Sequence, residues 1–512
     1  MLTEIFQKRK KNLLAWINKN KIEFLILLAI LLVAAFLRLY RINGYMTFLG
    51  DEGRDVLQVK RMIVDHKWTL LGPTASVGGF FLGPIYYYFM LPFLWLFRFD
   101  PVGPAVMVGL FGVATVFLVH KVGRDFFDTE AGLIAAGLYA ISPVVIAYSR
   151  SSWNPNLMPF FCLLTIYTLW LAVTKSQLNL LLLAGFLLGI AFQLHYLATF
   201  LVPVIIVYLL LFTTKVKNIK YYLLGLGGFL LGWLPFLLFE LRHRFPNFRT
   251  LYQFIFHGEE TGLVAANFWP TVSDVTLRLF NRLVTNNQLF LAQLTMFISL
   301  PTFVFFWIKW RKKEQLKTFT LLGLWLILGI GLFGFYQKPI YDYYLGFMFP
   351  LPFLLVGLTF SSLLKSSIGK VVVGILLAIL IIINLQSIPF RYPPNRQLDQ
   401  ARQIARVIFD RAEGKPFNFA LITGQNSDHA YRYFLEIWGD TPVTIENPQV
   451  DPERKTVTEQ LFVVCETLPC SPLGHSLWEI AGFGRAEIEE EWDVSVLKVY
   501  KLKHWQGEHE VL

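Results

Sequence analysis

The sequence predicts a mainly α-helical, polytopic membrane protein with about eleven transmembrane helices, interfacial helices in the first outer loop and a small C-terminal α/β domain. Of its 512 residues, 55% are hydrophobic and only 16% are charged, and the mean hydropathy is +0.51. Long apolar runs alternate with short clusters of Lys and Arg, a pattern typical of chains that cross a bilayer repeatedly. From Pro389 onward, shorter helical and strand-like runs replace this pattern.

The basic clusters account for the net charge of +11. In membrane proteins, Lys and Arg mark loops that stay in the cytoplasm, so we expect membrane lipids and no nucleic acid as partners. The basic segment 1–21 should stay inside, and residues 22–40 should form the first span, leading outward. This apolar run is too long for a signal-peptide core and lacks a small-residue cleavage site, so we interpret it as retained. Three cysteines are too few for a disulfide scaffold or a thiolate metal site.

Residues 82–97, LGPIYYYFMLPFLWLF, decide the topology. They number sixteen, with two prolines and three consecutive tyrosines, whereas a span needs about 20 residues. Tyrosine and tryptophan favour the membrane interface. We therefore expect an interfacial helix on the outer surface, with Tyr86 and Tyr87 contacting lipid. If this segment crossed the membrane instead, every later basic loop would lie outside.

With that placement, the basic loops lie inside, and Arg242 and Arg244 are outward exceptions that indicate functional charge. A loop is expected over residues 245–287. We expect a transmembrane domain over residues 22–390, with a catalytic outer loop at 43–98, and an extracytoplasmic α/β domain over 391–512 with a partly parallel sheet. The expected spans are residues 22–40, 102–120, 131–148, 157–174, 178–194, 197–212, 221–239, 288–308, 318–336, 345–363 and 371–388.

Unusual polar residues gather in the loops expected outside the cell membrane. Asp51-Glu52 opens an amphipathic stretch, Arg150 and Asn154 follow a span, and His195-Tyr196 and Tyr341–Tyr344 lie at two further span ends. Each group also has an ordinary explanation: acidic residues suit a helix N-terminus, arginine snorkels, and tyrosine belongs to the interfacial belt. Their convergence on one face favours a shared site.

This combination suits sugar transfer from a lipid-linked phosphate donor. A carboxylate can accept the proton of an attacking hydroxyl, and arginine can hold a phosphate leaving group. Aromatic faces suit sugar rings, and an interfacial helix suits a long isoprenoid tail. The sequence leaves two other classes open. A transporter or flippase of a lipid-linked saccharide should show inverted repeats and broken helices at the midplane, and a non-catalytic scaffold would only bind the lipid carrier.

The order of elements resembles the C-type integral-membrane glycosyltransferases, in particular the protein O-mannosyltransferase and aminoarabinose transferase superfamily. One span is followed by Gly50-Asp51-Glu52, by Gly83-Pro84-Ile85-Tyr86-Tyr87 and by a segment ending in Ser149-Arg150. The resemblance covers residues 22–390, most strongly 48–160. It implies a polyprenyl-phosphate-linked sugar donor, Asp51 as the base of an inverting transfer, and a carrier phosphate near Tyr343 or Tyr344. Where the family has a later outer acid, this chain has Asn154.

We therefore expect Asp51 and Glu52 to be catalytic, with the acceptor hydroxyl on a lipid, a glycan or a protein. We expect no metal site and no cofactor, although the resemblance leaves a divalent cation open. The residues expected at the donor phosphate or substrate are Arg54, Arg150, Asn154, His195, Tyr196, Arg242, Tyr343 and Tyr344.

Overall fold

The computed structural model describes residues 15, 17–75, 79–213, 219–256, 267–310, 313–336 and 338–507. Most of the basic segment 1–21 lies outside these residues. The chain divides into two compact units that each combine distant segments. The membrane unit comprises Met1–Tyr40, Thr69–Phe89 and Ala105–Pro393. The C-terminal unit comprises Arg41–Trp68, Met90–Pro104 and Pro394–Leu512.

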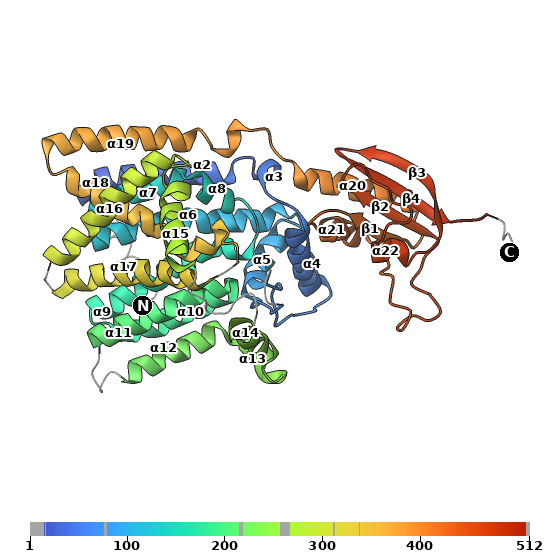
Figure 1. Cartoon of the computed structure of the whole chain (residues 1–512), viewed down its shortest axis with the longest axis horizontal. Helices are drawn as coiled ribbons and strands as arrows, with labels where there is room; N and C mark the ends of the chain where they lie inside the picture. The colour runs from blue at the N-terminus through green and yellow to red at the C-terminus, as the bar shows by residue number, and fades with distance from the viewer. Residues whose placement is uncertain are drawn as a thin grey trace. The chain divides into compact units, whose positions relative to one another are not determined.

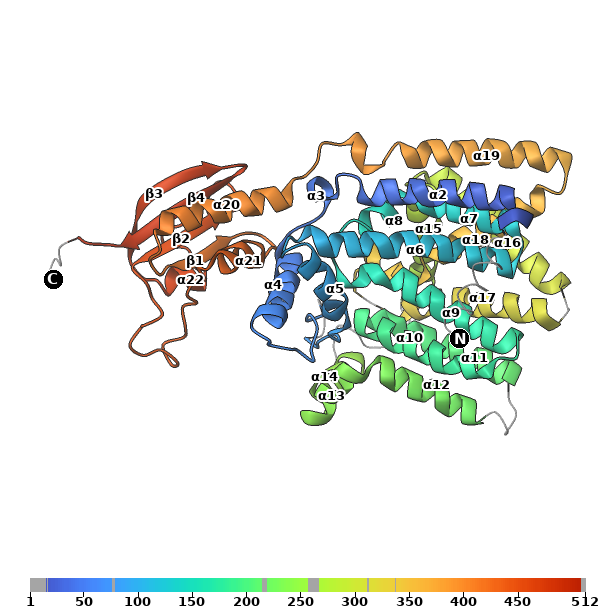
Figure 2. The same ribbon diagram turned by 180° about the vertical axis from the view of Figure 1, so that it is seen from behind.

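The membrane unit is a bundle of apolar helices. Its long members, among them α2, α6, α9, α11, α17 and α19, share one direction in both views (Figure 1, Figure 2). The helices are α2 (Lys21–Leu39), α6 (Val102–Phe126), α7 (Thr129–Ile141), α8 (Pro143–Tyr148), α9 (Met158–Thr174), α10 (Leu181–Leu194), α11 (Leu201–Thr213), α12 (Ile219–Gly232), α13 (Leu234–Arg242), α14 (Pro246–Phe256), α15 (Phe268–Leu283), α16 (Leu289–Lys309), α17 (Lys313–Gly331), α18 (Pro350–Leu363) and α19 (Ser367–Leu385).

Within the described residues, seven helices are long and apolar enough to cross a membrane, or up to nine if each of two bent pairs is one span. The bent pairs are α12 with α13, at 77°, and the 3₁₀ turn Asp342–Met348 with α18, at 57°. Each of the eleven expected spans falls on one of these helices, on a bent pair, or on the shorter α7–α8 and α10. The helical membrane class is confirmed, and the count of eleven stays a prediction. The expected loop at 245–287 is wrong in part, because α14 and α15 lie within it.

Helix α5 (Ile85–Leu96) occupies the segment that we expected at the interface. Its 12 residues extend over about 18 Å, less than the roughly 30 Å of a hydrocarbon core. This length fits an interfacial helix and not a span.

Close packing of α10 on α12 fixes the end of α10, where His195 follows. Gly185 and Gly189 on α10 face the backbone of α12, and a Cβ on Gly185 would overlap the carbonyl oxygen of Gly225. Small residues at such spacing let two membrane helices approach until their backbones touch. The end of α10 therefore lies beside the break between α12 and α13, where Gln193 Nε2 donates to the Gly232 carbonyl oxygen at 2.6 Å, and His195-Tyr196 follows directly.

The C-terminal unit is a small α/β domain extended by the segment around α4. Its elements are α3 (Ile42–Tyr45), α4 (Gly50–Val64), α20 (Gln397–Ala412), β1 (Asn418–Ile422), α21 (His429–Trp438), β2 (Gln460–Cys465), α22 (Trp478–Ala481), β3 (Ala486–Val494) and β4 (Leu497–His504). The sheet order is β1-β2-β4-β3, with β1 parallel to β2 and the other pairs antiparallel. The expected α/β domain with a partly parallel sheet is confirmed.

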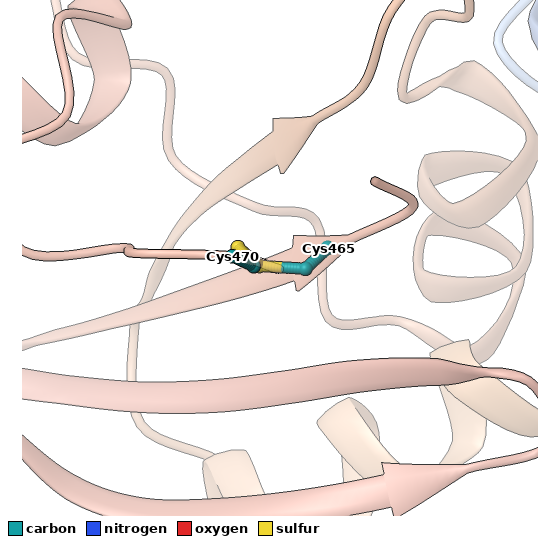
Figure 3. The surroundings of a disulfide bond; sticks show 2 residues. All are labelled: Cys465 and Cys470. Carbon is teal, nitrogen blue, oxygen red and sulfur yellow. A yellow bond between two sulfur atoms is a disulfide. The ribbon is translucent and has the colours of Figure 1, made fainter. Parts of the chain in front are cut away.

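The core of this domain includes Leu461 and Val463 of the fully buried strand β2 and Leu502 of β4. At the end of β2, Cys465 forms a disulfide with Cys470 (Figure 3). Cys162 is buried and free. Two of the three cysteines thus form a local crosslink that the sequence analysis did not predict.

Candidate functional site

Helix α4 presents the Asp51-Glu52 pair at its first turn. The two carboxylates point to different surroundings, because successive residues on a helix are about 100° apart. Glu52 is 5% exposed, and its Oε2 accepts a hydrogen bond from the Leu49 N–H at 3.1 Å. Glu52 therefore caps the helix from its third position. The Asp51 side chain is 54% exposed, so it is the member of the pair that is open to a reactant.

Arg54 links Asp51 to a second carboxylate, Asp55. Its Nη1 lies 2.8 Å from Asp51 Oδ1, and its Nη2 lies 2.8 Å from Asp55 Oδ1. Asp55 is fully buried, and burial raises its pKa to about 7, although the neighbouring Arg54 works in the opposite direction. Arg54, expected at the donor phosphate, is thus held between two carboxylates on its own helix.

The opposite side of α4 rests on the loop and helix around α21. Gly50 and Gly53 lie on this side, and a Cβ on Gly53 would overlap the backbone nitrogen of Ala430. Further along α4, the Arg61 guanidinium donates to both oxygens of Glu436, at 3.2 and 2.8 Å. Burial works against the charged form of Glu436, but Arg61 and Lys60 outweigh it and lower the pKa of Glu436. Asp51 is therefore carried by a helix that is anchored at both ends.

In the membrane unit, four of the expected site residues come together. The His195 ring lies 5.7 Å from the Tyr343 ring and 5.4 Å from the Tyr344 ring, and the Tyr196 ring lies 6.1 Å from that of Tyr344. We call His195, Tyr196, Tyr343 and Tyr344, with Trp153 and Tyr336 beside them, the aromatic cluster. Asn154 supports it indirectly, because its Nδ2 donates to the Leu194 carbonyl oxygen at 2.6 Å, immediately before His195.

An apolar cavity of about 260 Å³ adjoins this cluster, and Tyr196 and Tyr336 form part of its wall. Phenylalanine, leucine and tryptophan side chains supply most of the remaining wall. The lining includes Phe80, Phe81, Phe192, Phe200, Trp233, Phe248 and Phe335, together with Asn247.

Arg150 and Arg242 belong neither to the aromatic cluster nor to the cavity wall. Arg150 is 2% exposed, and its Nη1 and Nη2 donate to the carbonyl oxygens of Leu37 and Tyr40 at 2.8 and 2.9 Å. Its forked donors therefore satisfy the C-terminus of α2, whose last carbonyl groups have no partners within the helix. Arg242 lies exposed at the end of α13. A phosphate contact for either residue stays a prediction.

Tyr86 and Tyr87, which we expected to contact lipid, are buried instead. The Tyr86 hydroxyl is hydrogen-bonded to Ser152 Oγ at 2.8 Å, so this first turn of α5 packs on protein. The exposed apolar side chains of α5 are at its other end, where Trp95 and Leu96 are 61% and 62% exposed. These two residues are better placed to meet lipid.

Sequence reasoning missed two supports of the site. Buried Glu240 accepts a hydrogen bond from Asn247 Nδ2 at 2.7 Å, and Asn247 Oδ1 accepts one from the Phe81 N–H at 2.9 Å. On α15, Arg282 pairs with Asp342 at 2.7 Å, at the start of the turn that carries Tyr343 and Tyr344. The period of buried Val275, Leu279 and Leu283 was a signal for α15, whereas nothing in the sequence indicated the role of Glu240.

Among the described residues, no group of three or more His, Cys, Asp or Glu side chains could hold a metal ion. Around Asp51, the partners of the carboxylates are arginine and backbone N–H groups.

Comparisons with known proteins agree with this architecture. Residues 82–239 match the family model of dolichyl-phosphate-mannose-protein mannosyltransferases. Two Bacillus subtilis (strain 168) proteins are 31% identical: "Putative mannosyltransferase YycA" over 130 residues and "Putative mannosyltransferase YkcB" over 93 residues. The matches cover 24% and 18% of this chain but only 19% and 13% of the lengths of those relatives.

Two solved structures share the fold over most of the chain. ArnT from Cupriavidus metallidurans bound to undecaprenyl phosphate has a TM-score of 0.63 at 12% identity, covering 93% of this chain and 97% of that one. The archaeal oligosaccharyltransferase AglB from Archaeoglobus fulgidus, in complex with an inhibitory peptide and a dolichol-phosphate, has a TM-score of 0.55 at 13% identity, covering 88% and 70%. The resemblance seen in the sequence is confirmed: residues 82–239 match the mannosyltransferase family model, and the chain shares its fold with ArnT and AglB.

Proposed function

We propose that this protein transfers a sugar from a polyprenyl-phosphate-linked donor to an acceptor hydroxyl on the outer face of the cell membrane. The observation that carries the proposal is the apolar cavity beside the aromatic cluster. A wall of phenylalanine and tryptophan suits isoprenoid units, and the hydroxyl groups of Tyr196 and Tyr336 suit phosphate or sugar oxygens. The polyprenyl phosphates named with both solved structures support this donor class.

In the proposed reaction, the acceptor oxygen attacks the anomeric carbon as the bond from that carbon to the phosphate oxygen breaks. The phosphate leaves with the bonding electron pair, and Asp51 takes the proton of the acceptor hydroxyl. Because the phosphate needs no protonation near neutral pH, one carboxylate is sufficient. A single displacement of this kind inverts the anomeric centre. Arg54 would orient Asp51, and Glu52 would hold the start of α4.

Two features support an outer location for this chemistry. The Cys465–Cys470 disulfide suits an oxidising compartment, because such bonds are rare in the cytosol. The length of α5 suits an interfacial helix, and with that choice the Lys/Arg-rich loops fall on the cytoplasmic side.

The test is transfer by the purified full chain from a synthetic, labelled polyprenyl-phosphate hexose to envelope lipids, glycans and proteins. Asp51→Asn should reduce turnover by about 10²-fold or more while donor binding survives, because the amide keeps its size but cannot accept the proton. Asp410→Asn is the matched control: Asp410 is also 54% exposed and also pairs with an arginine on its own helix, Arg406.

Three results would contradict the proposal. Wild-type turnover in Asp51→Asn would remove Asp51 from the base role. Movement of intact donor across a vesicle membrane, with its sugar–phosphate bond preserved, would indicate a transporter. Donor binding without sugar transfer to any acceptor would indicate a scaffold.

A further inference from the structure

A hydrogen-bonded relay connects the C-terminal sheet to the first turn of α4. The Gly50 N–H donates to the side-chain oxygen of Asn426 at 2.8 Å. The same oxygen accepts the Ser427 N–H at 2.9 Å. Asn426 therefore satisfies one of the free N–H groups at the start of α4, as an N-cap residue would, but from a segment 376 residues away. Asp51 is the next residue along the helix.

Glu466 holds Asn426 in this orientation. The Asn426 Nδ2 donates to Glu466 Oε1 at 2.8 Å, and the Tyr431 hydroxyl donates to the same oxygen at 2.7 Å. Thr423 Oγ1 donates to Glu466 Oε2 at 2.7 Å. Because the carboxylate only accepts, it takes the NH₂ group of Asn426 and leaves the amide oxygen directed at Gly50.

Glu466 belongs to the short loop that the Cys465–Cys470 disulfide closes. Cys465 ends β2 and is fully buried, and its disulfide with Cys470 closes a ring of six residues that begins Cys465-Glu466. The Glu466 N–H also donates to the Ile422 carbonyl oxygen at 2.9 Å, at the end of β1. The backbone of Glu466 is thus fixed by the sheet on one side and by a covalent ring on the other.

We propose that Glu466 is a positioning residue for Asp51, acting through Asn426, and that the Cys465–Cys470 disulfide makes sugar transfer depend on the redox state of this loop. The inference rests on the proposed role of Asp51. Reducing the disulfide would release the constraint on the backbone of Glu466. The hydrogen bond between Glu466 and Asn426 would then weaken, and the first turn of α4 could shift. Displacement of a reacting group by about 1 Å can cost about 10²-fold in rate.

The first test compares Glu466→Gln with Glu413→Gln, an exposed control acid in the same unit. Glu466→Gln should lower kcat about tenfold or more with an unchanged KM for the donor, since Asp51 is displaced and donor binding is not. Adding Asn426→Asp should restore much of the loss. In that double variant the amide introduced at position 466 donates to the carboxylate introduced at position 426, whose other oxygen still accepts the Gly50 N–H.

A structural defect alone would not be repaired by exchanging the two chemical groups. Wild-type kcat in Glu466→Gln, or a double variant no better than the single one, would overturn the proposal. Hydrogen exchange of the full chain provides a readout independent of transfer: Glu466→Gln should accelerate exchange of the first amides of α4. Faster exchange without any transferase activity in the wild type would contradict the proposed function and leave the relay standing. Active enzyme with unchanged exchange would contradict the relay.

The second test uses dithiothreitol, which supplies two electrons and two protons to the disulfide and is itself oxidised to a cyclic disulfide. Reduction should lower wild-type kcat to that of Cys465→Ser/Cys470→Ser, and reoxidation should restore it. Cys162→Ala should remain as sensitive as the wild type, since Cys162 is a buried free thiol of α9. Full activity after verified reduction would overturn the redox part.

Discussion

Asp55, in the C-terminal unit, makes the stability of the protein depend on pH. It is fully buried beside Arg54, and its pKa is raised from 3.8 to about 7 because burial disfavours the carboxylate. Between these values the folded protein binds a proton that the unfolded chain does not. The contribution of Asp55 to stability is therefore complete below pH 3.8 and is lost as the pH rises through about 7.

Asp55→Asn should remove this dependence. The apparent melting temperature of the wild type should fall between pH 5 and pH 8, and the variant should show a smaller fall, since an amide has no proton to lose. Thermal unfolding in detergent across this pH range measures the difference. A slope in Asp55→Asn equal to that of the wild type would contradict the assignment.

Arg150 is buried and has a structural role at the end of α2. Its donors reach the carbonyl oxygens of Leu37 and Tyr40, and hydrogen bonds from a charged group are worth about 1.5–3 kcal/mol each. Arg150→Lys keeps the charge but cannot supply the planar fork, so its melting temperature should fall, whereas the exposed Arg242→Lys should not change it. A lowered donor affinity in Arg150→Lys, at unchanged melting temperature, would instead support the phosphate contact expected from the sequence.

At the scale of elements, the contact between α10 and α12 positions His195 and Tyr196. A Cβ on Gly185 overlaps backbone of α12, whereas one on Gly374, on the exposed face of α19, meets nothing within 4 Å. Gly185→Ala should therefore destabilise the folded protein by roughly 1–3 kcal/mol, because the added methyl group forces α10 and α12 apart. Gly374→Ala should be neutral or slightly stabilising, because it only removes backbone freedom.

Melting temperatures and transfer rates of the two variants check this prediction. Gly185→Ala should lower both the melting temperature and the transfer rate, because the aromatic cluster begins at the residue that follows α10. Equal melting temperatures and equal transfer rates in the two variants would mean that the close approach of α10 and α12 does not contribute to stability.

At the scale of the whole molecule, cysteine labelling tests the topology. In a Cys162→Ala background, Glu130→Cys should resist a membrane-impermeant thiol reagent added outside intact cells, and Glu413→Cys should react. Both positions are exposed, so access to the reagent depends on the side of the membrane. Labelling of Glu130→Cys from outside would overturn the interfacial placement of α5 and the shared outer face.

The apolar runs and their basic boundaries were enough to predict the helical membrane class and the location of each apolar segment. The same alternation brought His195, Tyr196, Tyr343 and Tyr344 to one face, and the structure places them in one cluster. The relay behind α4 could not be predicted, because Asn426 and Glu466 are ordinary polar residues until the fold brings them beside Gly50. Likewise, the sequence did not indicate that Arg150 is buried and donates to the end of α2, because a local pattern does not report burial.

The packing of α4 on α21 has a consequence for the order of events during synthesis. Arg61 and Glu436 are 375 residues apart, and ribosomes add about 5–20 residues per second. About 20–75 s therefore pass between the synthesis of the segment that carries Asp51 and the synthesis of α21, and most of the membrane helices emerge and insert during this time. Until then the buried face of α4, including Val56, Val59 and Met62, lacks its final covering. The nascent chain would thus insert its membrane helices first and complete the packing around its candidate base last.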